Sequence, residues 1–140
     1  MTHDRATAPT RLGDTGITSA WADRFASDWI AAWNARDLQA LLAHYREDVV
    51  FHSPFALRFA PESAGVVRGR TALGRYWQRA LEANPDLHFL PAQAVIPGLD
   101  SLALVYTSVR DLQAIEVMQF DDEGLVVRAH CHYRRKDLSA

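Results

Sequence analysis

The strongest constraint on the fold comes from the second half of the sequence, where four segments have the composition of β-strands. They are rich in β-branched and aromatic residues and are separated by short turn sequences such as "PGLDS" and "DDEG". Short turns between consecutive strands imply an antiparallel meander. The predicted strands are residues 87–96, 102–109, 112–120 and 125–134.

The first half of the sequence contains helical patterns. Residues 19–34 repeat apolar side chains at the i, i+4 spacing of one helix face, and Ser19 is the expected N-cap. Asp37 is expected to cap a short second helix that extends to Tyr45. A third helix is predicted over residues 71–83.

Between the second and third helices, residues 49–53 predict a strand that Pro54 ends, and residues 55–70 predict irregular structure. Three helices followed by a sheet indicate an α+β domain, here over residues 19–135. If the helices cover one face of a twisted sheet, a cavity can open between the two layers.

The length and net charge of the chain limit the kinds of binding partner that we expect. The chain has 140 residues, the length of one domain, and 49% of them are hydrophobic. Its net charge of -2 gives no broad attraction to nucleic acid or to an anionic membrane surface, so neither is expected as a partner. No apolar run approaches the ~18 residues of a membrane span.

The two ends of the chain are expected to lie outside the domain. Residues 1–18 lack the apolar middle of a signal peptide and predict a flexible leader, and residues 136–140 predict a short tail. The default location is therefore the cytoplasm. Cys131 is the only cysteine, which excludes an internal disulfide and fits a reducing compartment.

Glu116 is the unusual residue of the predicted strands. It stands in "IEVMQF", a run that is otherwise almost entirely apolar. Side chains alternate faces along a strand, and the face that carries Glu116 otherwise holds only apolar residues. That face is the better candidate for the helix-covered side, but the opposite register, with Ile115 and Val117 inward, leaves Glu116 in water. Alternation alone leaves both registers open.

Three segments resemble the nuclear transport factor 2-like superfamily, in particular its ketosteroid isomerases and SnoaL-like polyketide cyclases. They are "AAWNARDLQALLAHYREDVVFHSPF", "VVRGRTALGRYWQRAL" and "IEVMQFDDEGLVVRAHCHY", and the resemblance covers about residues 20–134. It implies a cone-shaped barrel, in which three N-terminal helices pack on a curved antiparallel sheet around an internal apolar pocket. It also implies a homodimer formed through the outer face of the sheet.

The resemblance assigns roles to single positions. Glu116 matches the isomerases' oxyanion-hole Asp, which implies that Glu116 points inward. Trp29 and Trp77 stand where the isomerases have tyrosines, whereas Tyr45 retains one. Ser53 stands where they have the general-base Asp, and a serine cannot act as a carboxylate base. Steroid isomerisation by the familiar mechanism is therefore not expected.

The catalytic hypothesis rests on Glu116, because burial raises the pKa of a carboxyl group and keeps it protonated closer to neutral pH. Such an acid can donate to a carbonyl or protonate an intermediate, and the protonated Asp of the isomerases is the known precedent for this role. Trp29 and Tyr45 are expected to orient it, and Ser53 or His52 to hold a water or a substrate oxygen. A purely structural Glu116, bonded to Trp29, Tyr45 or Tyr133, is the alternative.

Other candidate residues carry weaker signals. In the family register His52, His130 and His132 face outward, and the two histidines of His130-x-His132 alone do not predict a metal site. Cys131 has no neighbour in the sequence that would activate its thiol. An aromatic stripe suits a flat, apolar ligand as well as an ordinary core. The expected ligand-binding residues are Trp29, Trp33, Phe51, Phe55, Tyr76, Trp77, Met118, Cys131 and Tyr133.

The sequence thus predicts a small enzyme without a cofactor that transfers protons on an apolar, carbonyl-bearing molecule. Isomerisation, cyclisation and dehydration are the reactions that fit. Two alternatives use the same fold: a module that binds an apolar ligand without chemistry, and a dimeric scaffold whose own aromatic side chains fill the pocket.

Overall fold

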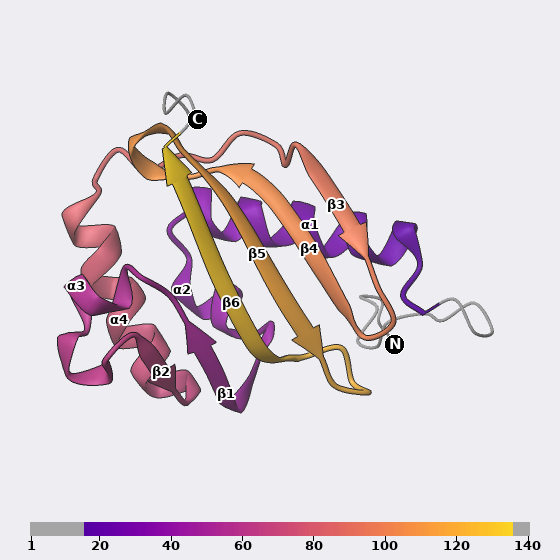
Figure 1. Ribbon diagram of the computed structural model, residues 1–140, viewed down its shortest axis with the longest axis horizontal. Coiled ribbons are helices and arrows are strands. Elements are labelled where there is room, and N and C mark those ends of the chain that lie inside the picture. The colour runs from indigo at the N-terminus through magenta and orange to yellow at the C-terminus, as the bar shows by residue number, and fades with distance from the viewer. Residues whose placement is uncertain (1–15, 136–140) are drawn as a thin grey trace.

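A computed structural model describes residues 16–135, which form an α+β domain with helices on one side of a curved, open six-stranded sheet (Figure 1). The helices are α1 (Ser19–Asn34), α2 (Leu38–Leu42), α3 (Ala56–Phe59) and α4 (Arg70–Ala83), with 3-10 turns η1 (Pro61–Ser63) and η2 (Val109–Asp111). The strands are β1 (Tyr45–His52), β2 (Val66–Arg68), β3 (Ala94–Pro97), β4 (Ser101–Thr107), β5 (Leu112–Phe120) and β6 (Val126–Arg135).

Helix α1 has the predicted bounds, but its N-cap is one residue earlier than expected. The Thr18 hydroxyl accepts a hydrogen bond from the Trp21 backbone N–H at 3.2 Å, which satisfies a donor that the helix itself leaves free. The prediction of Ser19 as N-cap is therefore wrong. In α2, the Asp37 carboxylate accepts from the Ala40 N–H at 3.0 Å, as predicted.

Tyr45 begins β1 instead of extending α2, which ends at Leu42. Strand β1 then pairs in parallel with β6, with Phe51 opposite Ala129, and antiparallel with the short β2. The sheet order is β2-β1-β6-β5-β4-β3. The predicted antiparallel meander of the last four strands is correct, but the whole sheet is mixed. The long connection from β1 to β6 permits the parallel pairing, which a short turn does not.

The first strand of the meander is shorter than its sequence pattern predicts. Residues 87–93 are irregular, and β3 begins only at Ala94. The Asn34 side chain takes the place of a strand partner there: its Nδ2 donates to the Phe89 carbonyl at 2.8 Å, and its Oδ1 accepts from the Phe89 N–H at 2.7 Å. Pro91 adds a residue without an N–H donor, which disfavours a paired strand.

The region predicted as irregular, residues 55–70, contains α3, η1 and β2. Helix α4 also begins at Arg70, one residue before the predicted start. The three predicted helices correspond to α1, α2 and α4, and α3 is an additional single turn. Its four residues are too few for a periodic pattern to reveal.

The described domain begins slightly before the predicted boundary. Ile17 is 4% exposed, and its backbone N–H donates to the Gly98 carbonyl at 3.0 Å. Residues 17 and 18 of the predicted leader thus belong to the folded unit, whereas its residues 1–15 and the predicted tail over residues 136–140 lie outside the described residues. No helix among residues 16–135 is long and apolar enough to cross a membrane.

Side-chain burial alternates along β5, and this pattern shows which face of the sheet covers the core. Its buried residues are Ala114, Glu116, Met118 and Phe120, and Ile115 on the opposite face is exposed. The inner face of the sheet packs against the aromatic side chains of α1, where Phe120 meets Trp21 edge-on at 5.0 Å. In Figure 1 α1 runs behind β3, β4 and β5, which leaves α3 and α4 to cover the β1 side.

Candidate functional site

An aromatic cavity lies between the helices and the inner face of the sheet, on the side covered by α3 and α4. Its volume is about 60 Å³, and its wall combines residues of α1, α3, α4, η2, β1, β4, β5 and β6. Ligand pockets for drug-sized molecules commonly hold about 300–1,000 Å³. The cavity therefore admits only a small part of such a ligand. Aromatic lining residues are Trp29, Trp33, Phe51, Phe55, Phe59, Tyr76, Trp77, Phe89, Tyr106 and Tyr133.

Glu116 lines this cavity from the middle of β5 and is 2% exposed. The prediction that it points inward is confirmed. Its Oε1 accepts a hydrogen bond from the Tyr106 hydroxyl at 3.3 Å. Its Oε2 is buried and has no hydrogen-bond partner. One oxygen of the carboxyl group is therefore held by Tyr106, and the other makes no hydrogen bond by distance and angle, although the Cys131 thiol lies close enough to act on the pKa of Glu116.

Burial raises the pKa of Glu116 from its usual 4.5 to about 7, because desolvation disfavours the charged carboxylate. The Cys131 thiol and the Tyr106 hydroxyl act in the opposite direction and limit the rise. Near neutral pH both the acid and the carboxylate are populated. A group in this condition can accept a proton and return it without a large free-energy cost.

The other ionisable oxygens and sulfur around Glu116 stay protonated at neutral pH. Burial raises the pKa of Tyr45, Tyr106 and Tyr133 above the usual phenol value, and it raises the pKa of the Cys131 thiol in the same way. Among the residues that line the cavity, Glu116 is thus the one whose charge changes near pH 7.

Trp33 contributes a second unsatisfied polar atom to the same cavity. Its side chain is 7% exposed, and its Nε1–H has no hydrogen-bond partner. Within residues 16–135, Trp33 Nε1 and Glu116 Oε2 are the two buried side-chain atoms in this condition. Buried polar groups are nearly always satisfied, so a donor and a carboxyl oxygen left free in one cavity indicate a site for a ligand or water.

The comparisons with known proteins agree with this architecture. The model of the SnoaL-like domain matches residues 26–138, which is most of the chain. The chain belongs to the SnoaL-like family. No curated protein matches it.

Solved structures extend this result. A SnoaL-like protein of unknown function from Burkholderia thailandensis is 41% identical, with 85% of this chain and 98% of that chain covered and a TM-score of 0.80. A candidate ketosteroid isomerase from Kribbella flavida is 19% identical, with 85% and 82% covered and a TM-score of 0.64. A candidate hydroxylase from Streptomyces galilaeus is 19% identical, with 85% and 92% covered and a TM-score of 0.64. The likeness to these last two concerns the fold.

Two predicted site residues of this SnoaL-like domain, Trp29 and Tyr45, are hydrogen-bonded to each other and not to Glu116. Trp29 Nε1 donates to the Tyr45 hydroxyl at 2.9 Å, and that hydroxyl lies 3.8 Å from the Met118 sulfur. The expectation that this pair orients Glu116 is wrong, because Tyr106 does so. Alternation along β4 turns Tyr106 inward, and the β4–β5 pairing places Leu104 opposite Glu116. Together, the alternation along β4 and its pairing with β5 could have identified Tyr106 as a neighbour of Glu116.

Ser53 is buried and engaged by two donors. Its Oγ accepts from the Tyr76 hydroxyl at 3.3 Å and from the Phe55 N–H at 3.2 Å. Tyr76 and Phe55 line the cavity, whereas Ser53 is not among the lining residues. The Ser53 hydroxyl therefore positions part of the cavity wall.

His52 lies on the outer face of the sheet, as the family register implies, so the alternative in which it holds a water or a substrate oxygen in the pocket is wrong. Its ring stacks on His130 with centroids 4.0 Å apart, because alternation along β1 turns Phe51 inward instead. His130 and His132 are exposed on the same face, as predicted. Within residues 16–135, no group of three or more potential metal-binding side chains comes together.

Most of the residues predicted to bind a ligand line the cavity, and their binding of a ligand stays a prediction. Met118 and Cys131 are buried on the inner face but do not line the cavity. The sequence did not predict three further lining residues. Phe89 lies in an irregular segment, and Arg58 and Arg110 are exposed residues of the cavity wall. The predicted residues that do line the cavity are Trp29, Trp33, Phe51, Phe55, Tyr76, Trp77 and Tyr133.

Proposed function

We propose that this SnoaL-like domain is a small enzyme that transfers a proton on an apolar, carbonyl-bearing molecule by isomerisation, cyclisation or dehydration. The observation that carries the proposal is the state of Glu116. Its carboxyl group is buried in an aromatic cavity, one of its oxygens has no partner, and its pKa is raised to about 7. Burying a carboxyl group without full hydrogen bonding costs free energy, and carboxyl groups in this condition are typical of functional sites.

One carboxyl group can serve both halves of such a reaction. In the carboxylate form, Glu116 Oε2 removes a proton from the carbon next to the substrate carbonyl, and the electron pair of the broken C–H bond moves toward the carbonyl oxygen as an enolate forms. The Glu116 acid then returns the proton to another carbon, which completes an isomerisation. A pKa near the working pH favours both steps, so Ser53 at the usual base position does not prevent them.

Trp33 supplies the complementary donor. Negative charge develops on the carbonyl oxygen as the enolate forms, and a fixed N–H group in a water-poor cavity stabilises such charge. The Trp33 Nε1–H is buried, lines the cavity and has no partner within the protein. Because it makes no internal hydrogen bond, it can bind a substrate oxygen without breaking one.

The proposal is tested with 2-tetralone, a neutral bicyclic ketone that carries a fused benzene ring and has exchangeable hydrogens next to its carbonyl. In D₂O near neutral pH, the chain is expected to accelerate deuterium incorporation at these positions, followed by NMR. The control is the same buffer with heat-denatured protein. A ketone that binds but exchanges only at the buffer rate would favour a binding module over an enzyme.

Replacing Trp33 with Phe is expected to weaken 2-tetralone binding about fivefold to tenfold, because one buried hydrogen bond contributes ~1 kcal/mol. The matched control is Trp21→Phe, which removes the same group from a buried tryptophan that does not line the cavity. Isothermal titration measures both affinities. Equal weakening in the two variants would assign the effect to packing and count against Trp33 as a donor.

The second candidate function is a binding module or scaffold without chemistry. It is favoured by the small cavity volume of about 60 Å³ and by the aromatic side chains that occupy the surrounding space. Trp33 packs edge-on against Trp77 with centroids 5.2 Å apart, and Phe55 packs edge-on against Tyr133 at 4.6 Å. A crystal structure with 2-tetralone excluded from the cavity would support the scaffold, whereas bound 2-tetralone without exchange would support the binding module.

A further inference from the structure

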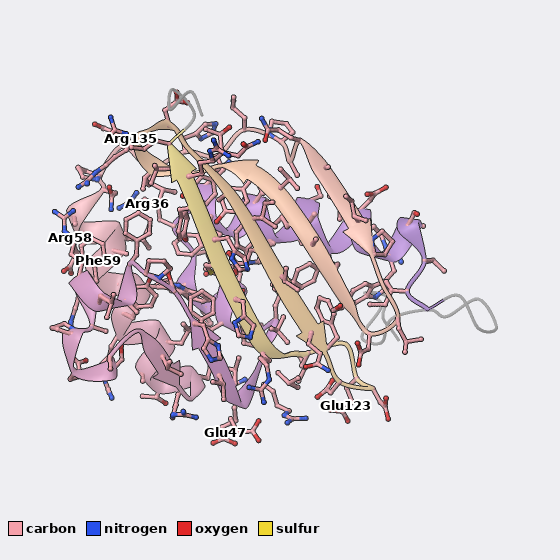
Figure 2. The ribbon with its side chains drawn as sticks, viewed as in Figure 1. Arg36, Glu47, Arg58, Phe59, Glu123 and Arg135 are labelled. Atoms are coloured by element: carbon pink, nitrogen blue, oxygen red, sulfur yellow. The ribbon has the colours of Figure 1, made fainter. Side chains whose placement is uncertain are left out.

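The mouth of the cavity carries two positive charges. Arg58 on α3 and Arg110 on η2 both line the cavity, and both are exposed. The ion pairs recorded among residues 16–135 do not include either guanidinium group. Figure 2 shows Arg58 beside Phe59 on the α3 side of the molecule.

The position of Arg58 is fixed by an aromatic contact. Its guanidinium carbon lies 5.2 Å from the centroid of the Phe59 ring, and Phe59 is itself a lining residue. A cation held over a ring at the rim stays beside the opening instead of extending into water. By contrast, Arg79 on the neighbouring helix donates to the Phe59 carbonyl and to Glu62, so its charge is already partnered.

Negative charge does not balance these arginines within the cavity. Glu116 is the one acidic residue in the wall, and its pKa of about 7 leaves it partly neutral. An outer cleft of about 450 Å³ adjoins the cavity through shared residues, among them Arg110, and it also contains Asp86 and Asp111. Charges in the outer cleft are therefore mixed, whereas the cavity wall itself carries two arginines and the single, partly neutral Glu116.

We propose that the ligand of this site bears a carboxylate, which Arg58 and Arg110 bind at the mouth while its carbonyl end enters the aromatic cavity toward Glu116. The inference rests on the proposed function for the position of the carbonyl. A guanidinium group matches the planar carboxylate in geometry as well as in charge. The small cavity agrees with this arrangement, because only the reacting end of the ligand has to enter it.

Two pairs of probes test the proposal: 4-acetylbenzoate with 4-acetylbenzamide, and the longer 4-acetylcinnamate with its primary amide. Within each pair the ketone and ring are the same, and only the acid carries charge. Affinities are measured by titration at about pH 6, where the acids are ionised and Glu116 is mostly protonated. The acid of at least one pair is expected to bind about tenfold more tightly than its amide.

The double variant Arg58→Gln/Arg110→Gln is expected to remove this preference for the acid. The matched control is Arg24→Gln/Arg75→Gln, which lowers the net charge equally at two exposed arginines that do not line the cavity. Circular dichroism checks that both variants are folded. A preference that disappears equally in the control would assign it to overall charge and overturn the proposal.

The remaining outcomes separate the inference from the proposed function. If acids and amides of both lengths bind equally, the carboxylate inference is wrong, and the exchange of 2-tetralone still decides the proposed function. If 2-tetralone exchanges only at the buffer rate but the acids keep their preference, the proton-transfer proposal fails and the site is one for acidic ligands. If no probe binds, the inference is overturned.

Discussion

Glu116→Gln is expected to lower the catalysed exchange of 2-tetralone by about 10²–10³-fold while the protein stays folded. The expected size is that of general acid–base catalysis by one positioned group, ~10²–10⁴-fold. Glutamine keeps the length of the side chain and an oxygen that can accept from Tyr106, which donates to Glu116 Oε1 at 3.3 Å. It removes only the ability to take and return a proton.

The control for this prediction is Glu47→Gln, at an exposed carboxyl group on β1 that lies outside the cavity lining (Figure 2). The wild-type rate is also expected to rise with pH through about 7, as the Glu116 carboxylate forms, and to level off above it. An unchanged rate in Glu116→Gln, or a pH profile that the variant shares, would remove Glu116 from the reaction.

The inward position of Glu116 was predictable only with the resemblance, because alternation favoured one face but left both registers open. Alternation along β5 grouped it with Ala114, Met118 and Phe120, and the resemblance to the isomerases matched it to an inward acid. All four side chains are buried. A strand of nine residues offers enough alternating positions for a register to be recognised, whereas the four residues of α3 do not.

Its surroundings were harder to predict, because they depend on pairing between segments far apart in the sequence. Tyr106 reaches Glu116 only through the register between β4 and β5, and Phe89 is buried because the Asn34 side chain binds its backbone. Arg58 and Arg110 come from a single helical turn and a tight turn that carry no periodic pattern. The local sequence pattern therefore identified Glu116, but it did not identify the residues that surround it in the cavity.

The parallel pairing of β1 with β6 explains why the histidines are not in the site. It places His52 opposite His130 on the outer face, where the two rings stack, and it turns Phe51 into the cavity. The sheet thus separates Glu116 from the two histidines. Glu116 is enclosed on the inner side, and its protonation is set by burial rather than by the histidines.

The same burial makes Glu116 a destabilising residue at alkaline pH, and the free energy of unfolding is expected to show this. In the unfolded chain the carboxyl group ionises with its usual pKa of 4.5, but in the folded chain it ionises only at about 7. Between these values the folded state holds a proton that the unfolded state has released, so stability falls as pH rises. A rise from 4.5 to about 7 corresponds to ~3 kcal/mol, at ~1.4 kcal/mol per pH unit.

Glu116→Gln removes this titration, so the variant is expected to gain about 3 kcal/mol over the wild type when the pH is raised from about 4.5 to about 8. Urea unfolding of both proteins across this range measures the difference. Because all other ionisable groups are shared, their contributions cancel when the two proteins are compared at each pH. A difference that stays constant with pH would show that Glu116 ionises normally in the folded state, and the acid–base role proposed for it would lose its physical basis.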